Sequence, residues 1–274
     1  MSCIPALVKR MRVDMPSENA GNVVVALAQP PVIRGAVAEN LTTHLRYIKH
    51  AARHDADVIV FPELSLIGYE PDLLEALAMP YDAEAFKTLS AAAVENNMVV
   101  IAGGPLINDG GKPRIGAVIC FPDGARTFYA KQHLHDGEEA YCSPGDEACL
   151  FTVNGVRIAL AICADFVHTI HSDAASARKA AVYLASVLIS DGGYEADAQC
   201  LAGIARRHGM PVLFSNHISD TGSWQTCGRS GGWNAQGERL VGADGREACL
   251  VIAAIRDGVL EGASGRVIAM DSVA

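Results

Sequence analysis

Among the residues that could carry out chemistry in this sequence, Cys163 has the clearest setting. Residues 158–165 read I-A-L-A-I-C-A-D, an uncharged run of strand-forming character that leads into the thiol. Such runs are typical of buried parallel strands, and open α/β sheets place their chemistry at the carboxyl ends of these strands. Cys163 is therefore a candidate nucleophile, although a free cysteine in a core strand is more often an inert small hydrophobe.

Two acids and a lysine also follow predicted strands. Glu63 comes directly after the strand predicted at residues 57–61, where burying a carboxylate is costly unless another group hydrogen-bonds to it. The simpler interpretation of Glu63 is an acid that precedes a helix, since a short helix is predicted at residues 72–78. Lys131 follows the strand predicted at 125–130, and Glu138 lies in the next loop. A lysine after a strand and an acid in a loop are usually solvated, so none of these residues decides a function alone.

The elements that would position these side chains alternate between strands and helices. Apolar runs predict strands at residues 23–28, 57–61, 98–103, 114–121, 125–130, 158–163, 182–190, 211–216, 238–241 and 248–254, and helical spacing predicts helices at 36–53, 83–96, 173–179 and 196–208. Two β-α-β runs thus flank an antiparallel meander. We expect the strands at 238–241 and 248–254 to complete the edge of a second sheet. The layout predicts an α/β fold with two mixed sheets and helices on both outer faces.

Size and charge exclude several classes of protein. The chain has 274 residues, of which 50% are hydrophobic, enough for a sizeable core. No stretch resembles a linker, so we expect an N-terminal extension at residues 1–22 and a single domain at 23–274. The net charge of −9 and the dispersed basic residues argue against a nucleic-acid partner. There is no signal-peptide pattern and no apolar run of membrane-spanning length, which favours a cytoplasmic protein without a membrane partner.

The cysteines and histidines do not form metal-binding patterns. Eight cysteines occur without a C-x-x-C pair, which favours reduced thiols. The histidines do not form a cluster that would indicate a metal site, and the nearest candidates are the pairs His133 with His135 and His168 with His171. We therefore expect no metal and no other cofactor.

Taken in order, three short motifs resemble those of the nitrilase or carbon–nitrogen hydrolase superfamily. They are Phe61-Pro62-Glu63-Leu64, Tyr129-x-Lys131-x-x-Leu134 and Ile162-Cys163-x-Asp165. The resemblance covers about residues 23–254. It implies a four-layer α-β-β-α sandwich, which matches the layout predicted from the elements.

The resemblance also implies roles for the three residues. An unperturbed thiol is mostly protonated at neutral pH, so Cys163 needs a base. By resemblance Glu63 is that general base, and Lys131 and the backbone N–H of Ala164 stabilise the oxyanion that forms when the thiolate attacks an amide carbonyl. A thioester on Cys163 would follow, and water activated by Glu63 would release the acid.

A second glutamate often accompanies this set in the family. Counting seven residues back from the glycine of the Pro-Gly pair selects Glu138, which we expect to orient Lys131 or the substrate. We assign Tyr69 and Asn216, together with Ala164, to substrate binding or oxyanion stabilisation.

The substrate stays open at this point. Many members of the family carry an arginine and a Pro-Glu pair soon after the cysteine, whereas residues 164–171 read A-D-F-V-H-T-I-H. Recognition of a substrate carboxylate is therefore not carried over from arginine-bearing members. We predict a thiol hydrolase that cleaves the non-peptide C–N bond of a small amide. N-carbamoyl amide hydrolysis and nitrile hydrolysis are the alternatives.

Two other classes of function are alternatives. A non-catalytic interaction protein with the same fold would not need a buried acid beside a lysine and a thiol. A redox-sensing thiol would pair Cys163 with Cys142 or Cys149, for which the sequence offers no geometry. The resemblance further implies a homodimer or larger homo-oligomer, assembled through the helices at 173–179 and 196–208.

Overall fold

Two mixed β-sheets form the centre of this computed structural model, which describes residues 21–270. Within those residues the first sheet has seven strands in the order β13-β12-β1-β2-β3-β4-β5, and the second has six in the order β11-β10-β9-β8-β7-β6. The strands of the first sheet are β1 (Asn22–Gln29), β2 (Val58–Val60), β3 (Val99–Leu106), β4 (Arg114–Cys120), β5 (Arg126–Ala130), β12 (Cys249–Arg256) and β13 (Val259–Ala269). Those of the second are β6 (Cys149–Val153), β7 (Val156–Ile162), β8 (Val182–Val187), β9 (Val212–Asn216), β10 (Gly231–Trp233) and β11 (Arg239–Gly242). The central strands β1, β2 and β3 are parallel, as are β7, β8 and β9.

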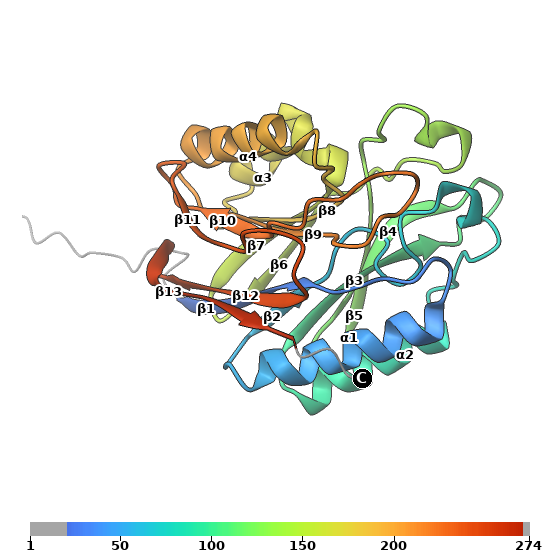
Figure 1. Cartoon of the computed structure of the whole chain (residues 1–274), viewed down its shortest axis with the longest axis horizontal. Coiled ribbons are helices and arrows are strands. Elements are labelled where there is room, and N and C mark those ends of the chain that lie inside the picture. Colours follow the sequence, from blue (N-terminus) through green and yellow to red (C-terminus); the bar gives the residue numbers. More distant parts are fainter. Residues whose placement is uncertain (1–20, 271–274) are drawn as a thin grey trace, which may run out of the picture.

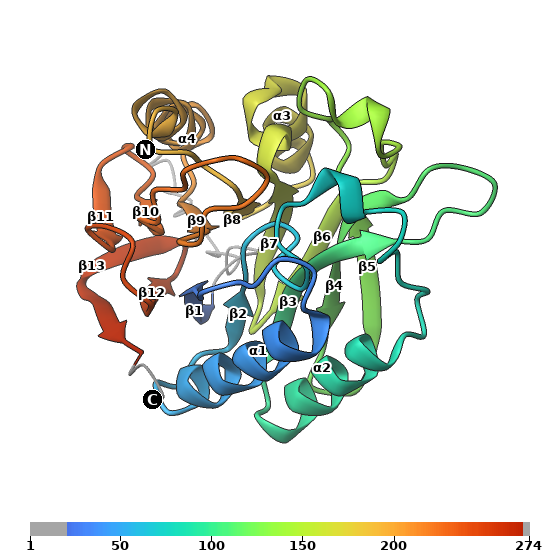
Figure 2. The ribbon, with the colours of Figure 1, turned by 45° about the vertical axis from the view of Figure 1, so that its right-hand side comes forward.

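Two helices cover the outer face of each sheet. Helices α1 (Val37–Ala52) and α2 (Glu84–Glu95) lie on the first sheet, and α3 (Thr169–Ala177) and α4 (Tyr194–His208) lie on the second (Figure 1). The same layering is visible from a second direction (Figure 2). The predicted four-layer α-β-β-α sandwich is therefore confirmed.

The apolar pattern of the central strands explains the layering. In β7, Ile158, Leu160 and Ile162 pack into the core that the two sheets share, while Ala159 and Ala161 pack into the core beneath α3 and α4. Successive side chains of a strand point to opposite faces, so a strand buried on both faces must be apolar throughout. The small alanines on the helical side are consistent with close packing of the helices.

One predicted strand belongs to the other sheet. Strand 248–254 is β12, which pairs antiparallel with β1 and β13 in the first sheet, so its predicted place at the edge of the second sheet is wrong. The strand predicted at 238–241 is β11 and does form the edge of the second sheet. An apolar run predicts a buried strand but does not say which sheet the strand joins.

Three strands and one helix were not predicted correctly. Strand β6 forms a hairpin with β7 through Asn154-Gly155, a turn signal that was present in the sequence. Strand β10 is three residues long, and the sequence of β13 contains Gly262 and Gly265, which weaken its apolar pattern. The helix predicted at 72–78 is a single 3-10 turn, Pro71–Leu73. The predicted extension at residues 1–22 lies outside the described residues except for Gly21 and Asn22, and that division stays a prediction.

Hydrogen bonds join the two sheets where their parallel strands end. The Ser186 hydroxyl donates to the carbonyl of Phe61 (2.8 Å), and the Ser215 hydroxyl donates to the carbonyl of Ala28 (2.5 Å). His217 Nε2 lies 2.6 Å from the carbonyl oxygen of Glu63. The carboxyl ends of both sets of parallel strands are thus fixed against each other, and the candidate catalytic residues lie at this junction.

Candidate active site

Glu63 is held in a tight turn after β2. Its side chain is fully buried, and the next residue, Leu64, has a left-handed backbone with φ of 52°. Gly103 of β3 packs so closely beneath this turn that an added Cβ would lie 2.4 Å from the Leu64 nitrogen. The turn and the glycine together aim the carboxylate at the junction of the sheets.

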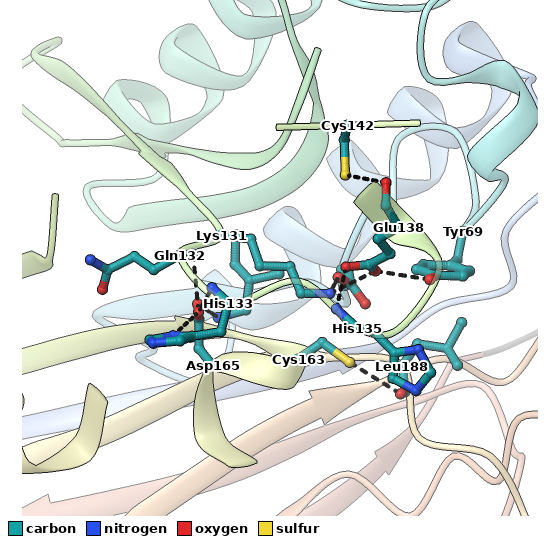
Figure 3. Close-up of polar contacts among 12 residues, drawn as sticks. Tyr69, Lys131, Gln132, His133, His135, Glu138, Cys142, Cys163, Asp165 and Leu188 are labelled. Carbon is teal, nitrogen blue, oxygen red and sulfur yellow. Dashed lines mark hydrogen bonds and ion pairs between the residues drawn. The ribbon is translucent and has the colours of Figure 1, made fainter. Parts of the chain in front are cut away.

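Lys131 lies between two buried carboxylates. It extends β5 by one residue, since its N–H donates to the carbonyl of Ile115. Its Nζ donates to Glu138 Oε1 at 2.7 Å (Figure 3) and to Glu63 Oε1 at 2.8 Å. All three side chains are buried. The sequence brings these residues from three separate segments, and the predicted association of Lys131 with both acids is present in the structure.

Glu138 is itself anchored by two further donors. It begins the 3-10 turn Glu138–Ala140. The Tyr69 hydroxyl donates to its Oε1 (2.8 Å), and the backbone N–H of His135 donates to its Oε2 (2.8 Å). This carboxylate is therefore occupied on both oxygens and suits an orienting role.

Cys163 begins a short turn at the end of β7. It has a φ of 44°, a left-handed backbone that is uncommon outside glycine, and it opens the 3-10 helix Cys163–Val167. Its thiol donates weakly to the carbonyl of Leu188 at 3.5 Å (Figure 3). Glu63 Oε2 is buried with no hydrogen-bond partner among the described residues, and Glu63 and Cys163 line the same cavity.

Burial and charge set the protonation of the three groups. Burial raises the pKa of Glu63 to about 7, although the ammonium of Lys131 opposes the rise. Burial and the charge of Glu63 raise the pKa of the Cys163 thiol well above its usual value. Burial alone would lower the pKa of Lys131, but the neighbouring acids raise it, so Lys131 stays an ammonium. Near neutral pH Glu63 can therefore be ionised while the thiol keeps its proton.

A buried carboxylate ties the lysine loop to the cysteine loop. Asp165 Oδ1 accepts from the backbone N–H groups of Gln132 (3.0 Å) and His133 (2.9 Å), and its Oδ2 accepts from the Tyr129 hydroxyl (2.6 Å) and the Ile162 N–H (2.9 Å). The first two donors follow Lys131, and the last one precedes Cys163. The sequence marked Asp165 only as part of a motif, and the structure gives it a positioning role.

A cavity of about 370 Å³ opens at the thiol. Its walls are formed by Glu63, Tyr69, His135, Glu138, Cys163, Ala164, Phe166, Val167, Leu188, Ser190, Gly193, Asp197 and Trp224. Most of the outer wall was not predicted from the sequence, because these residues come from loops and from the start of α4 and carry no pattern of their own. Phe166 and Val167 had one signal, their position just after the nucleophile.

The structure brings together all but one of the predicted site residues. Ala164 and Tyr69 line the cavity, but Asn216 does not. The Asn216 amide accepts from the N–H of Ile189 (2.7 Å) and donates to the carbonyls of Ile189 (3.0 Å) and Gly228 (2.8 Å). Its predicted role in substrate binding is therefore replaced by a role in fixing the loop after β8.

Three other features of residues 21–270 bear on the chemistry. The seven cysteines in this part of the chain are free thiols. In the same residues no three histidine, cysteine or acidic side chains are grouped so that they could hold a metal ion. None of the helices described is both long and apolar enough to cross a bilayer.

Comparison with known proteins gives consistent findings. A family model described as carbon–nitrogen hydrolase matches residues 24–263. Among curated proteins, an (R)-stereoselective amidase from Pseudomonas sp. is 33% identical over 132 residues, which are 48% of this chain and 47% of that protein. An omega-amidase from Bos taurus is 30% identical over 138 residues, which are 47% of this chain and 50% of that protein. The chain thus spans about half the length of these curated relatives.

Solved structures show the same fold. A nitrilase-superfamily amidase from Nesterenkonia superposes with a TM-score of 0.79 at 21% identity, covering 87% of this chain and 92% of that chain. A further structure of that amidase, also with a TM-score of 0.79, carries the acetamide moiety of fluoroacetamide added covalently at its active-site cysteine.

Proposed function

Because this chain belongs to the carbon–nitrogen hydrolase family, we propose that it hydrolyses the C–N bond of a small non-peptide amide through a thioester on Cys163. One observation carries the proposal. The Glu63 carboxylate, which forms a buried ion pair with Lys131, and the Cys163 thiol line the same cavity. Such a group of buried ionised residues costs folding free energy and is best explained by chemistry.

The first step is proton transfer and attack. Ionised Glu63 takes the proton of the Cys163 thiol, whose pKa is too high for it to ionise alone at neutral pH. The sulfur then forms a bond to the amide carbonyl carbon, and the carbonyl electrons move to the oxygen.

The resulting oxyanion needs donors that are already in place. Lys131 is held as an ammonium between two carboxylates and cannot move away. Ala164 lines the cavity and is the second residue of a one-turn helix, where the backbone N–H has no partner within the helix. These two groups support the oxyanion assignment.

Collapse of this intermediate releases the amine and then the acid. Protonated Glu63 returns its proton to the leaving nitrogen, which departs as ammonia or an amine and leaves a thioester on Cys163. Glu63 then takes a proton from water, whose oxygen attacks the thioester carbonyl. The C–S bond then breaks, and Glu63 returns its proton to the sulfur. The products are a carboxylic acid and the regenerated thiol, so the reaction consumes one water.

Rates of ammonia release give a first test of this proposal. We expect wild-type protein to release ammonia from at least one member of a panel of short neutral amides, with nitriles and N-carbamoyl compounds included in the panel. Cys163→Ala should lower the rate at least about a thousandfold, since removing a nucleophile removes the whole pathway. Cys149→Ala, which removes a partly exposed thiol outside the cavity, should keep the activity.

A trapped intermediate provides a second readout. Rapid quenching at acidic pH should show wild-type protein heavier by the acyl group, and hydroxylamine should remove that mass. Ammonia release that persists in Cys163→Ala at the wild-type rate would overturn the proposal.

Assembly and location stay predictions. We propose a homodimer or larger homo-oligomer formed through α3 and α4, and sedimentation equilibrium tests it, with a monomer as the contrary result. The cytoplasmic location is proposed on the same footing and is tested by fractionation of the source cells.

A further inference from the structure

Asp197 carries a carboxylate on the cavity wall that has no partner among residues 21–270. It lies in the first turn of α4 and lines the same cavity as Cys163. Among the residues that the structure describes, none forms a hydrogen bond or an ion pair with its carboxylate. Burial raises the pKa of Asp197 while the charge of His135 lowers it, so the carboxylate is partly desolvated.

The cavity as a whole carries negative charge. Glu63 and Glu138 share one cation, Lys131, which leaves a net charge of −1 when Glu63 is ionised. Asp197 makes the total −2. No lysine or arginine occurs among the residues that line the cavity, and His135 is the one lining side chain that can become a cation. A substrate that carries a carboxylate would therefore be repelled at a pH where imidazole is neutral.

The surroundings of Asp197 suit a cationic group. An added Cβ on Gly193 would lie 3.4 Å from Asp197 Oδ2 and 3.2 Å from the Ser190 hydroxyl, so these three residues form one section of wall. Trp224 adds an indole ring to the cavity, and its side chain is 41% exposed. A carboxylate, a hydroxyl and an indole face are the groups that bind an alkylammonium.

A simpler role for Asp197 would be to stabilise the start of α4, because acids in a first turn interact favourably with the helix dipole. Glu195 lies in the same turn, with a side chain that is 83% exposed and outside the cavity. If Asp197 only stabilises the start of α4, replacing Asp197 and replacing Glu195 should have similar effects on the activity toward each substrate. A role in substrate binding predicts an effect from Asp197 alone, so Glu195→Gln is a matched control.

We propose that Asp197 binds an ammonium group of the substrate, and that the substrates are therefore amides that carry a protonated amine a few carbon atoms from the carbonyl. This inference rests on the proposed amide hydrolysis and names its substrate class. Asp197 contacts the substrate at a distance from the reacting carbonyl, so it acts on binding more than on the chemical step.

Three amides of similar size test the charge preference at pH 8. They are 4-aminobutanamide, butanamide and succinamate, in which the far end is an ammonium, a methyl group and a carboxylate. Wild-type kcat/KM should be highest for 4-aminobutanamide and lowest for succinamate. Asp197→Asn should lower the ratio of kcat/KM for 4-aminobutanamide to that for butanamide by about tenfold or more, mainly through KM, as expected for one charge-assisted hydrogen bond.

Glu195→Gln should leave that ratio at the wild-type value. The inference is overturned if wild-type protein prefers succinamate, if Asp197→Asn leaves the ratio unchanged, or if Glu195→Gln lowers it equally. The wild-type ranking serves as a test that does not depend on the folding of any variant.

Binding separates this inference from the proposed reaction. Calorimetry at pH 8 should show 4-aminobutanamide binding to Cys163→Ala protein about tenfold or more tightly than to the Cys163→Ala/Asp197→Asn double variant. Equal binding would overturn the ammonium site. Binding that depends on Asp197 without turnover of any amide by wild-type protein would support the site and overturn the proposed hydrolysis.

Discussion

The ionisation of Glu63 should control activity near neutral pH. Burial raises its pKa from 4.5 to about 7. The pH dependence of kcat/KM reports groups of the free enzyme, so the rate constant should rise along a limb centred near pH 7 if Glu63 accepts the thiol proton. At pH 5 about 1% of Glu63 would be ionised, against about 75% for a carboxyl with a pKa of 4.5. We therefore expect kcat/KM at pH 5 to be about 100-fold below its plateau.

The same pKa predicts how stability depends on pH. Because the pKa of Glu63 is higher in the folded state, its contribution to stability is fully present below pH 4.5 and is lost as the pH rises through 7. The difference between 4.5 and 7 corresponds to about 3 kcal/mol in total, most of which is lost between pH 5 and pH 8. Glu63→Gln carries no such charge. Its free energy of unfolding relative to wild type should therefore increase by about 2–3 kcal/mol from pH 5 to pH 8.

Urea denaturation at both pH values measures this difference, and initial rates with a neutral amide from pH 5 to pH 9 measure the limb. Comparing two pH values cancels the pH-independent effects of the substitution. Glu84→Gln is the control, because Glu84 is 85% exposed. Its free energy of unfolding relative to wild type should be the same at pH 5 and pH 8. A constant difference for Glu63→Gln, together with a rate limb near pH 4.5, would refute the assignment of Glu63 as the base.

Three further substitutions test the groups around the base. Glu138→Gln should move the acidic limb of kcat/KM to lower pH, because the charge of Glu138 raises the pKa of Glu63, and an unmoved limb would contradict this. Asp165→Asn presents an amide to four donors, so it should lower the free energy of unfolding by about 1–3 kcal/mol and reduce kcat more than it raises KM. An unchanged kcat would count against its positioning role. Gly103→Ala places a Cβ 2.4 Å from the Leu64 nitrogen and should cost about 1–3 kcal/mol of stability together with activity, so a wild-type melting temperature and rate would contradict it.

The sequence predicted the inner part of the site better than its outer wall. Glu63, Lys131 and Cys163 each follow a predicted strand, and parallel strands of one layer end at the same edge of a sheet. Their order along the chain resembled a known family, which supplied roles that spacing alone left open. The structure places all three at one junction of the two sheets.

The outer wall depends on tertiary contacts that leave no local pattern. Asp197 has the sequence setting of an ordinary helix-start acid, the same as that of Glu195, and only the tertiary structure makes one of them line the cavity. Asn216 was misjudged for the converse reason. A polar residue at the end of a buried strand suggests a binding role, but here its amide is fully used in hydrogen bonds to the backbone.

Several unfavourable features lie where the two sheets meet, and the sheets themselves hold them in place. Cys163 and Leu64 have left-handed backbones, and two acids and a lysine are buried beside them. Each such feature costs on the order of a kilocalorie per mole or more and persists only where the surrounding structure fixes it. The inter-sheet hydrogen bonds from Ser186 and His217 to the segment around Glu63, and the Asp165 network around Cys163, provide that constraint from both sides. The base and the nucleophile belong to different sheets, so their distance is set by how the sheets pack, and changes in that packing should reduce catalysis before they unfold the chain.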